Sequence, residues 1–169
     1  MKRRDLLAVA GLMAAAPIAA HAKTTKPVTA AQAIAAAMKE PALRPFRSQI
    51  EAAMRVLDAY IDGFNARSVE AFDAAFNFPS VRLANNTLRI INKGDQKASL
   101  FTTGSLADWD HTGWEHRQVI QAGADKVHVD CRFARYRKNG SLLAAFDSLY
   151  VINNEAGHWG VKIRSSYAP

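Results

Sequence analysis

The order of the periodic segments constrains this chain most strongly, because two helical patterns come first and every later pattern is typical of a strand. The four longest strand patterns cover residues 114–121, 127–136, 142–152 and 159–166. Short connections join them, and one, Lys138-Asn139-Gly140, has the residue types of a tight turn. Neighbouring strands joined by such turns run antiparallel, so these four should form a meander. Helices followed by a sheet indicate an α+β fold.

The long helix is expected from about residue 47 to 66, because apolar residues recur there at spacings of three and four. Ser68 then has the character of an N-cap for a second helix that ends at Phe78-Pro79. Residues 81–84 and 88–91 flank Asn85-Asn86, a pair that favours a tight hairpin. The apolar stripe of the long helix comprises Ile50, Met54, Leu57, Ile61 and Phe64.

Residues 1–22 have the pattern of a secretory signal peptide. Basic residues precede an apolar run from Leu6 to Ala20, and small residues follow at Ala20-His21-Ala22. We expect cleavage after Ala22 and a periplasmic or secreted protein, and the pair Arg3-Arg4 resembles a twin-arginine export signal. The run is shorter than the roughly 20 apolar residues of a membrane span, so no stable membrane anchor is expected after cleavage.

The remaining chain suits one domain. Residues 23–46 are rich in alanine, are interrupted by prolines, and are interpreted as an accessory N-terminal segment before a domain at 47–169. Removal of Lys2, Arg3, Arg4 and Asp5 lowers the formal net charge from +7 to +5, which is only mildly basic. The basic and aromatic residues at 132–138 alternate as on any half-exposed strand, so no nucleic-acid partner is expected.

The histidines and the one cysteine do not predict a metal site. They lack the short spacings of zinc ligands, and no cofactor motif is present, so neither a metal nor a cofactor is expected. A lone cysteine cannot form an intramolecular disulfide, and we expect it in the core. These residues are His111, His116, His128, Cys131 and His158.

Asp147 lies near the middle of the most apolar strand pattern, residues 142–152. On a period of two it shares its side with Leu149, so its carboxyl group is expected to enter an apolar lining. A carboxyl group in such a place needs a partner or a raised pKa, which makes it a candidate for chemistry. The alternative is a structural ion pair with Arg82 or Arg164, either of which also has the planar fork that binds anionic ligands.

The chain resembles the nuclear-transport-factor-2-like superfamily, in which SnoaL-like polyketide cyclases, scytalone dehydratase and ketosteroid isomerase share a cone-shaped fold. The residues that carry this resemblance are the run 60–66 (Tyr-Ile-Asp-Gly-Phe-Asn-Ala), Phe72 and Phe76 behind it, and residues 147–151 and 157–159. The resemblance covers the whole mature domain. It implies a curved antiparallel sheet around the long helix, with an apolar pocket at the mouth of the cone.

The resemblance also implies roles for particular residues. Tyr60 matches the phenol that polarises a substrate carbonyl in ketosteroid isomerases, and Asp147 matches its partner. The position of the general base falls at Ala84, which cannot take a proton, so the chain departs from ketosteroid isomerase. His116 and His111 are therefore the candidate bases. Trp109, Trp114 and Leu149 are expected beside the ligand, together with Arg82 and Arg164.

Two functions follow as hypotheses. The first is a domain that binds a small, largely apolar carbonyl or hydroxyl compound and, if it is an enzyme, catalyses a cofactor-free isomerisation, dehydration or related lyase step. The alternative is a non-catalytic ligand-binding or dimeric assembly module. The opposite side of residues 142–152 is too apolar to face water, which predicts a homodimer through the sheet. That side carries Leu142, Phe146, Tyr150 and Ile152.

Overall fold

A computed structural model describes residues 27–168. The expected signal peptide and its cleavage site after Ala22 lie outside the described residues, so export stays a prediction. In residues 27–168 no helix has both the length and the apolar character needed to cross a membrane.

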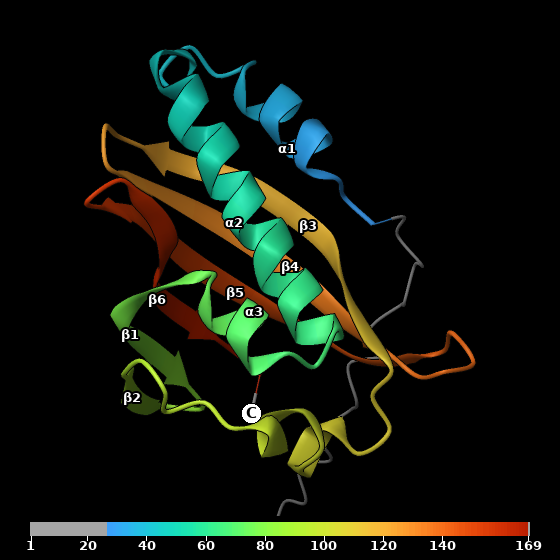
Figure 1. Ribbon diagram of the computed structural model, residues 1–169. Coiled ribbons are helices and arrows are strands. Elements are labelled where there is room, and N and C mark those ends of the chain that lie inside the picture. The colour runs from blue at the N-terminus through green and yellow to red at the C-terminus, as the bar shows by residue number, and fades with distance from the viewer. Residues whose placement is uncertain (1–26, 169) are drawn as a thin grey trace, which may run out of the picture.

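The described chain has three α-helices followed by one six-stranded sheet (Figure 1). The helices are α1 (Ala30–Ala37), α2 (Arg47–Asn65) and α3 (Val69–Asp73). The strands are β1 (Phe76–Ala84), β2 (Thr87–Ile91), β3 (His111–Ala122), β4 (Lys126–Tyr136), β5 (Leu142–Glu155) and β6 (His158–Ser166). Short 3-10 helices cover Arg44–Phe46, Ala98–Phe101 and Gly104–Leu106. The predicted α+β class is confirmed.

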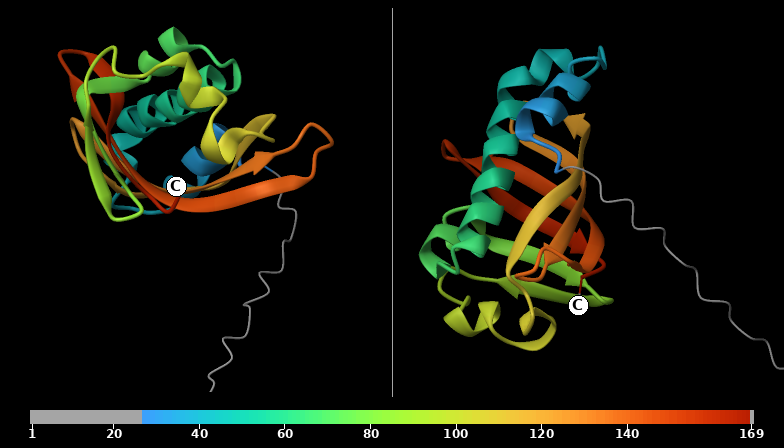
Figure 2. Two further views of the ribbon diagram at one scale, coloured as in Figure 1. Left: turned by 90° about the horizontal axis from the view of Figure 1, so that it is seen from below. Right: turned by 90° about the vertical axis from the view of Figure 1, so that its right-hand side faces the viewer.

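The strand order in the sheet is β2-β1-β6-β5-β4-β3. Strands β3 to β6 form the predicted antiparallel meander, and β1 and β2 form the predicted hairpin. The hairpin joins the meander through a parallel pairing of β1 with β6, which the sequence did not indicate. Figure 2 shows the sheet curving around α2, so that one face becomes the inner lining of a cone.

The core lies between α2 and this concave face. Ile50, Met54 and Leu57 of α2 have no exposed surface, and neither do Tyr150 and Ile152 of β5. The side of β5 predicted for dimerisation therefore faces α2 instead. Both sides of this strand are apolar, so its period of two alone did not determine which side faces the helix.

The second helix is shorter than predicted. Ser68 caps it as expected, because its side chain accepts a hydrogen bond from the backbone N–H of Ala71 at 3.1 Å. The helix ends at Asp73, and Phe76 begins β1, so the boundary expected at Phe78-Pro79 is wrong. Phe76 is buried as its helical spacing implied, but it is buried from a strand that pairs with β6.

The N-terminal segment is attached to the sheet. Thr29 caps α1 in a capping box with Gln32, and the backbone N–H of Val28 donates to the carbonyl of Trp114 at 2.9 Å. The buried guanidinium of Arg117 donates to the carbonyl of Val28 at 2.7 Å and to Asp58 of α2. This segment, α2 and β3 are therefore joined through one side chain.

Gly63 allows α2 and α3 to touch. A Cβ atom there would lie 2.6 Å from the backbone nitrogen of Phe72, and real Cβ atoms do not approach backbone so closely. We predict that Gly63→Ala lowers the free energy of unfolding by about 1–3 kcal/mol, because α3 must move away. Gly123→Ala is the control, since its nearest atom would lie 3.8 Å away. Equal stability of both variants in urea denaturation would contradict this packing.

Candidate functional site

A small cavity of about 30 Å³ lies inside the cone, between the second half of α2 and the inner face of the sheet. Its walls are mostly aromatic or aliphatic, with a few polar groups pointing inward. The lining residues are Tyr60, Ile61, Phe64, Thr112, Phe133, Arg135, Tyr150 and Arg164.

Arg164 of β6 brings a positive charge to this cavity. Its guanidinium donates hydrogen bonds to the Tyr60 hydroxyl and to the Ser166 hydroxyl, both at 2.9 Å. Its Nε atom is buried and makes no hydrogen bond within the described part of the chain. The guanidinium also lies over the rings of Phe133 at 5.1 Å and Tyr150 at 5.6 Å. Arg164 therefore contacts neutral hydroxyls and aromatic faces.

Two more arginines approach the same region. Arg82 of β1 is directly paired with Arg164 in the parallel ladder, and Arg135 of β4 is buried, with 7 % of its surface exposed. Burial, and after it the positive charge of Arg164, lowers the pKa of Arg135 to about 10. Burial and Arg164 also lower the pKa of Arg82. Three cationic side chains from three strands thus share one end of the cone.

Two tyrosines complete the polar lining. Tyr60 and Tyr150 meet edge to face, with ring centroids 5.5 Å apart. Tyr150 is fully buried, and its hydroxyl makes no hydrogen bond of ordinary geometry within residues 27–168. Burial raises the pKa of Tyr150 well above its usual value of 10, so the hydroxyl keeps its proton at neutral pH.

Asp147 lies on the outer face of the sheet, with 63 % of its side chain exposed. Both carboxylate oxygens accept a hydrogen bond from Arg132 at 3.0 Å. The expected pair of Asp147 with Tyr60 does not form, and neither does an ion pair with Arg82 or Arg164 within the described residues. The expectation that Asp147 enters an apolar lining was wrong, because it placed the side of β5 that carries Asp147 inside the cone. The side that carries Tyr150 and Ile152 faces inward instead.

The candidate bases also lie outside the cavity. A bulge in β3 between Trp114 and His116 breaks the alternation, so Trp114 and Arg117 face inward while His116 faces out. The His116 imidazole lies 3.5 Å from Asp130, with 45 % of its side chain exposed. The His111 imidazole lies 2.8 Å from Asp110, but at the surface, where the imidazole stacks on Tyr136.

The remaining predicted contacts divide between the core and the surface. Trp109 is buried, and its indole N–H donates to the Thr112 hydroxyl at 2.9 Å. Trp114 is buried against Tyr150 and Phe133. Neither tryptophan lines the cavity. Leu149 is 37 % exposed on the outer face, beside Asp147.

The sequence analysis missed Arg135 and Tyr150 as cavity residues. A signal for Arg135 was present, because Phe133 and Arg135 share one side of β4 on a period of two. Tyr150 was assigned to the outside because the opposite face of β5 was taken as the lining. The one cysteine, Cys131, lies in the core as predicted, with 1 % of its surface exposed.

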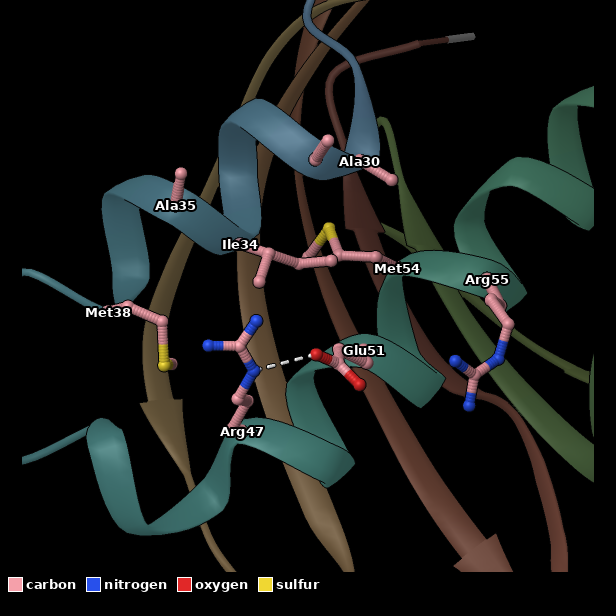
Figure 3. A pocket seen from close by; sticks show the side chains of 9 residues that line it. Ala30, Ile34, Ala35, Met38, Arg47, Glu51, Met54 and Arg55 are labelled. Carbon is pink, nitrogen blue, oxygen red and sulfur yellow. Dashed lines mark hydrogen bonds and ion pairs between the residues drawn. The ribbon is translucent and has the colours of Figure 1, made fainter.

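A larger hollow lies outside the cone, in the groove between α1 and α2 (Figure 3). Its volume is about 620 Å³, and its lining is mainly alanine and methionine. The charged groups on its rim are Arg55 and the ion pair of Arg47 with Glu51, at 2.9 Å. Among residues 27–168, no three His, Cys, Asp or Glu side chains gather as a metal site would require.

We predict that Asp147→Asn changes the free energy of unfolding by less than about 1 kcal/mol, because exposed ion pairs contribute little to stability. Arg132 also retains its bond to Glu115 at 3.0 Å. Urea denaturation measures this change. A loss of several kcal/mol would show that Asp147 has a buried role that its exposure does not indicate.

Solved structures support the fold. A ketosteroid isomerase-like protein from Erwinia carotovora atroseptica SCRI1043 is 20% identical, with 70% of this chain and 95% of that chain covered and a TM-score of 0.52. A cystatin-like-fold protein of unknown function from Nostoc punctiforme PCC 73102 is 10% identical, with 70% and 89% covered and a TM-score of 0.58. An NTF2-like protein from Novosphingobium aromaticivorans is 12% identical, with 77% and 90% covered and a TM-score of 0.57.

Identities this low show a shared fold and leave the reaction open. No significant match was found among curated proteins. The family described as NTF2-like protein (DUF6841) matches residues 50–168, which run from α2 to the end of the described chain. The resemblance to the nuclear-transport-factor-2-like superfamily is thereby confirmed, and the chain belongs to this NTF2-like family.

Proposed function

We propose that this protein is a small-molecule-binding domain whose cone holds the polar end of its ligand at Tyr60 and Arg164. The observation that carries the proposal is the convergence of these two side chains, 2.9 Å apart, on a cavity with mostly aromatic and aliphatic walls. Binding sites for small molecules have this composition, with few polar groups fixing the orientation of the ligand.

Binding is favoured over proton-transfer catalysis. The described residues that line the cavity include no carboxylate and no imidazole, the usual bases at neutral pH. The positions expected to supply them, Asp147, His116 and His111, are on the outside. These observations support the non-catalytic alternative.

The volume of the cavity limits what can bind without rearrangement. About 30 Å³ is the share of one molecule in liquid water. The space therefore suits one functional group, and the rest of a larger ligand must displace side chains. Arginine side chains at the site have the flexible stems that such a displacement requires.

We predict that Tyr60→Phe weakens the binding of a carbonyl or hydroxyl ligand about 5- to 10-fold, because one hydrogen bond is lost and the ring remains. The ligand is first found by thermal-shift screening of aromatic carbonyl and hydroxyl compounds. The affinity is then measured by calorimetry.

Tyr136→Phe is the matched control, since Tyr136 stacks on His111 away from the cavity lining. It should bind as the unaltered protein does. Equal affinities of all three proteins would remove Tyr60 from the site, and a screen without any stabilising compound would count against ligand binding altogether.

The outer face of the sheet supports assembly as a second candidate function. Two rows of mostly apolar side chains cross β5, β6, β1 and β2 on this face, in the order of the strand register. Leu88, Ile90 and Ile163 are 63 %, 61 % and 41 % exposed. One row is Val151, Ile163, Val81 and Ile90, and the other is Leu149, Ser165, Leu83 and Leu88.

We predict a homodimer through these two rows, because pairing two copies would remove this apolar surface from water. Ile163→Lys should convert the dimer to a monomer in size-exclusion chromatography with light scattering. Ile120→Lys is the control, since Ile120 is 51 % exposed but lies on β3, outside both rows. A monomeric unaltered protein would refute the dimer.

A further inference from the structure

We propose that residues 97–108 form a lid over the cone, and that the apolar part of the ligand is an aromatic ring that takes the place of the Phe101 side chain when the lid opens. This inference rests on the proposed ligand-binding function and adds the second half of the ligand and its way in. In Figure 1 the lid is the yellow segment beyond the C-terminal end of α2, and it contains the 3-10 helices Ala98–Phe101 and Gly104–Leu106.

The lid is held together by its own hydrogen bonds and is attached to the core by apolar packing. In the described part of the chain its backbone hydrogen bonds are short-range, such as Leu100 N–H to the Lys97 carbonyl at 2.9 Å and Leu106 N–H to the Thr103 carbonyl at 3.3 Å. Phe101 and Leu106 are buried, with 2 % and 6 % of their surfaces exposed. Since the short-range bonds move with the lid, it can open as a unit while α2 and the sheet stay folded.

Both ends of the lid are fastened, which gives the motion fixed hinges. Before it, the Gln96 side chain donates to the carboxylate of Asp73 in α3 at 2.7 Å. After it, the Arg67 guanidinium donates to the carbonyl oxygens of Trp109 at 3.3 Å and Asp110 at 3.2 Å, and lies over the Trp109 ring at 4.5 Å. Displacing the part between these ties leaves the ties intact, as in the lids that close other binding sites.

Phe101 joins the lid to the wall of the cavity. Its ring meets the rings of Phe64 and Phe72 edge to face, with centroids 5.4 Å and 6.2 Å away. Phe64 lines the cavity, and Phe72 packs on the Tyr60 ring at 4.8 Å. The Phe64 ring therefore borders both the cavity and the place of Phe101. When the lid moves, Phe64 has room to turn, and the two spaces join.

The joined space determines the class of the ligand. A cavity of about 30 Å³ holds one polar group, and the lid adds a space with the shape of a phenyl ring. Phe64 and Phe72 offer a ligand ring the edge-to-face contacts that they now make with Phe101. Tyr60 and Phe101 both pack on Phe72, so a short chain spans the two spaces. The class is therefore a single aromatic ring joined through a short chain to a hydroxyl or carbonyl group.

The test follows the lid in the folded full-length protein. A trifluoromethyl label on Ala98→Cys reports the lid by ¹⁹F NMR, because Ala98 is exposed and the buried Cys131 does not take the label. Titration with benzyl alcohol, 2-phenylethanol and 3-phenylpropanol should shift or split the lid signal in step with binding. The same label on Ala36→Cys, at an exposed alanine of α1 far from the lid, is the control and should keep its signal unchanged.

Matched alcohols and variants test the ring. By calorimetry, each phenyl alcohol should bind about 2- to 10-fold more tightly than the cyclohexyl alcohol of the same chain length. Phe101→Ala removes the side chain with which the ligand competes and should strengthen this binding at least about fivefold, and Phe101→Leu should strengthen it less. Phe46→Ala shortens a partly buried ring outside the lid and the cavity lining and should leave binding unchanged. Circular dichroism confirms that each variant is folded.

The outcomes separate this inference from the proposed function. If Tyr60→Phe weakens binding but the Ala98→Cys signal never responds, the lid is overturned and the ligand-binding function stands. A lid that responds with equal affinity in Tyr60→Phe removes Tyr60 from the site and leaves the lid standing. Equal binding of phenyl and cyclohexyl alcohols overturns the aromatic class. Binding to Phe101→Ala but not to the unaltered protein overturns the opening of the lid, and if no alcohol binds to any of these proteins, both proposals fail.

Discussion

The packing of α2 into the concave face of the sheet is the contact on which the rest of the structure depends. Ile50, Met54 and Leu57 are completely buried there, and each buried aliphatic side chain contributes about 1.5–3 kcal/mol to folding. The same helix carries Tyr60 one turn beyond Leu57, so the cavity continues the core packing. The Tyr60 hydroxyl reaches Arg164 because α2 packs against the strands.

This contact also determines which face of each strand is the inside. Strand β5 is apolar on both sides, and its own pattern is compatible with either orientation. Tyr150 and Ile152 face α2, so Asp147 and Leu149 face out. A carboxylate that looks buried in the sequence is thus solvated beside Arg132. The outer face, in turn, keeps apolar side chains such as Leu88 and Ile163 exposed.

The class of fold and the meander could be predicted because they depend on local signals, namely helical spacing, strand alternation and turn residues. The site could be predicted only in part, because its geometry depends on contacts between distant segments. One bulged residue in β3 turned His116 away from the cone, and the parallel pairing of β1 with β6 put Arg82 beside Arg164. Neither the bulge nor the parallel pairing can be recognised from the pattern of a single sequence.

The arginine in the cone explains why a related fold need not share a reaction. In the arrangement expected from ketosteroid isomerase, a carboxyl group beside the tyrosine would stay protonated, and therefore uncharged, and would donate a hydrogen bond. Here Arg164 takes that place, and its guanidinium makes a hydrogen bond to the Tyr60 hydroxyl. A neutral donor stabilises an oxyanion that forms during a reaction, whereas a guanidinium carries its charge before and after any reaction. The position beside Tyr60 where the resemblance to ketosteroid isomerase implies an acid therefore holds a guanidinium in this chain, and the reaction does not follow from the shared fold.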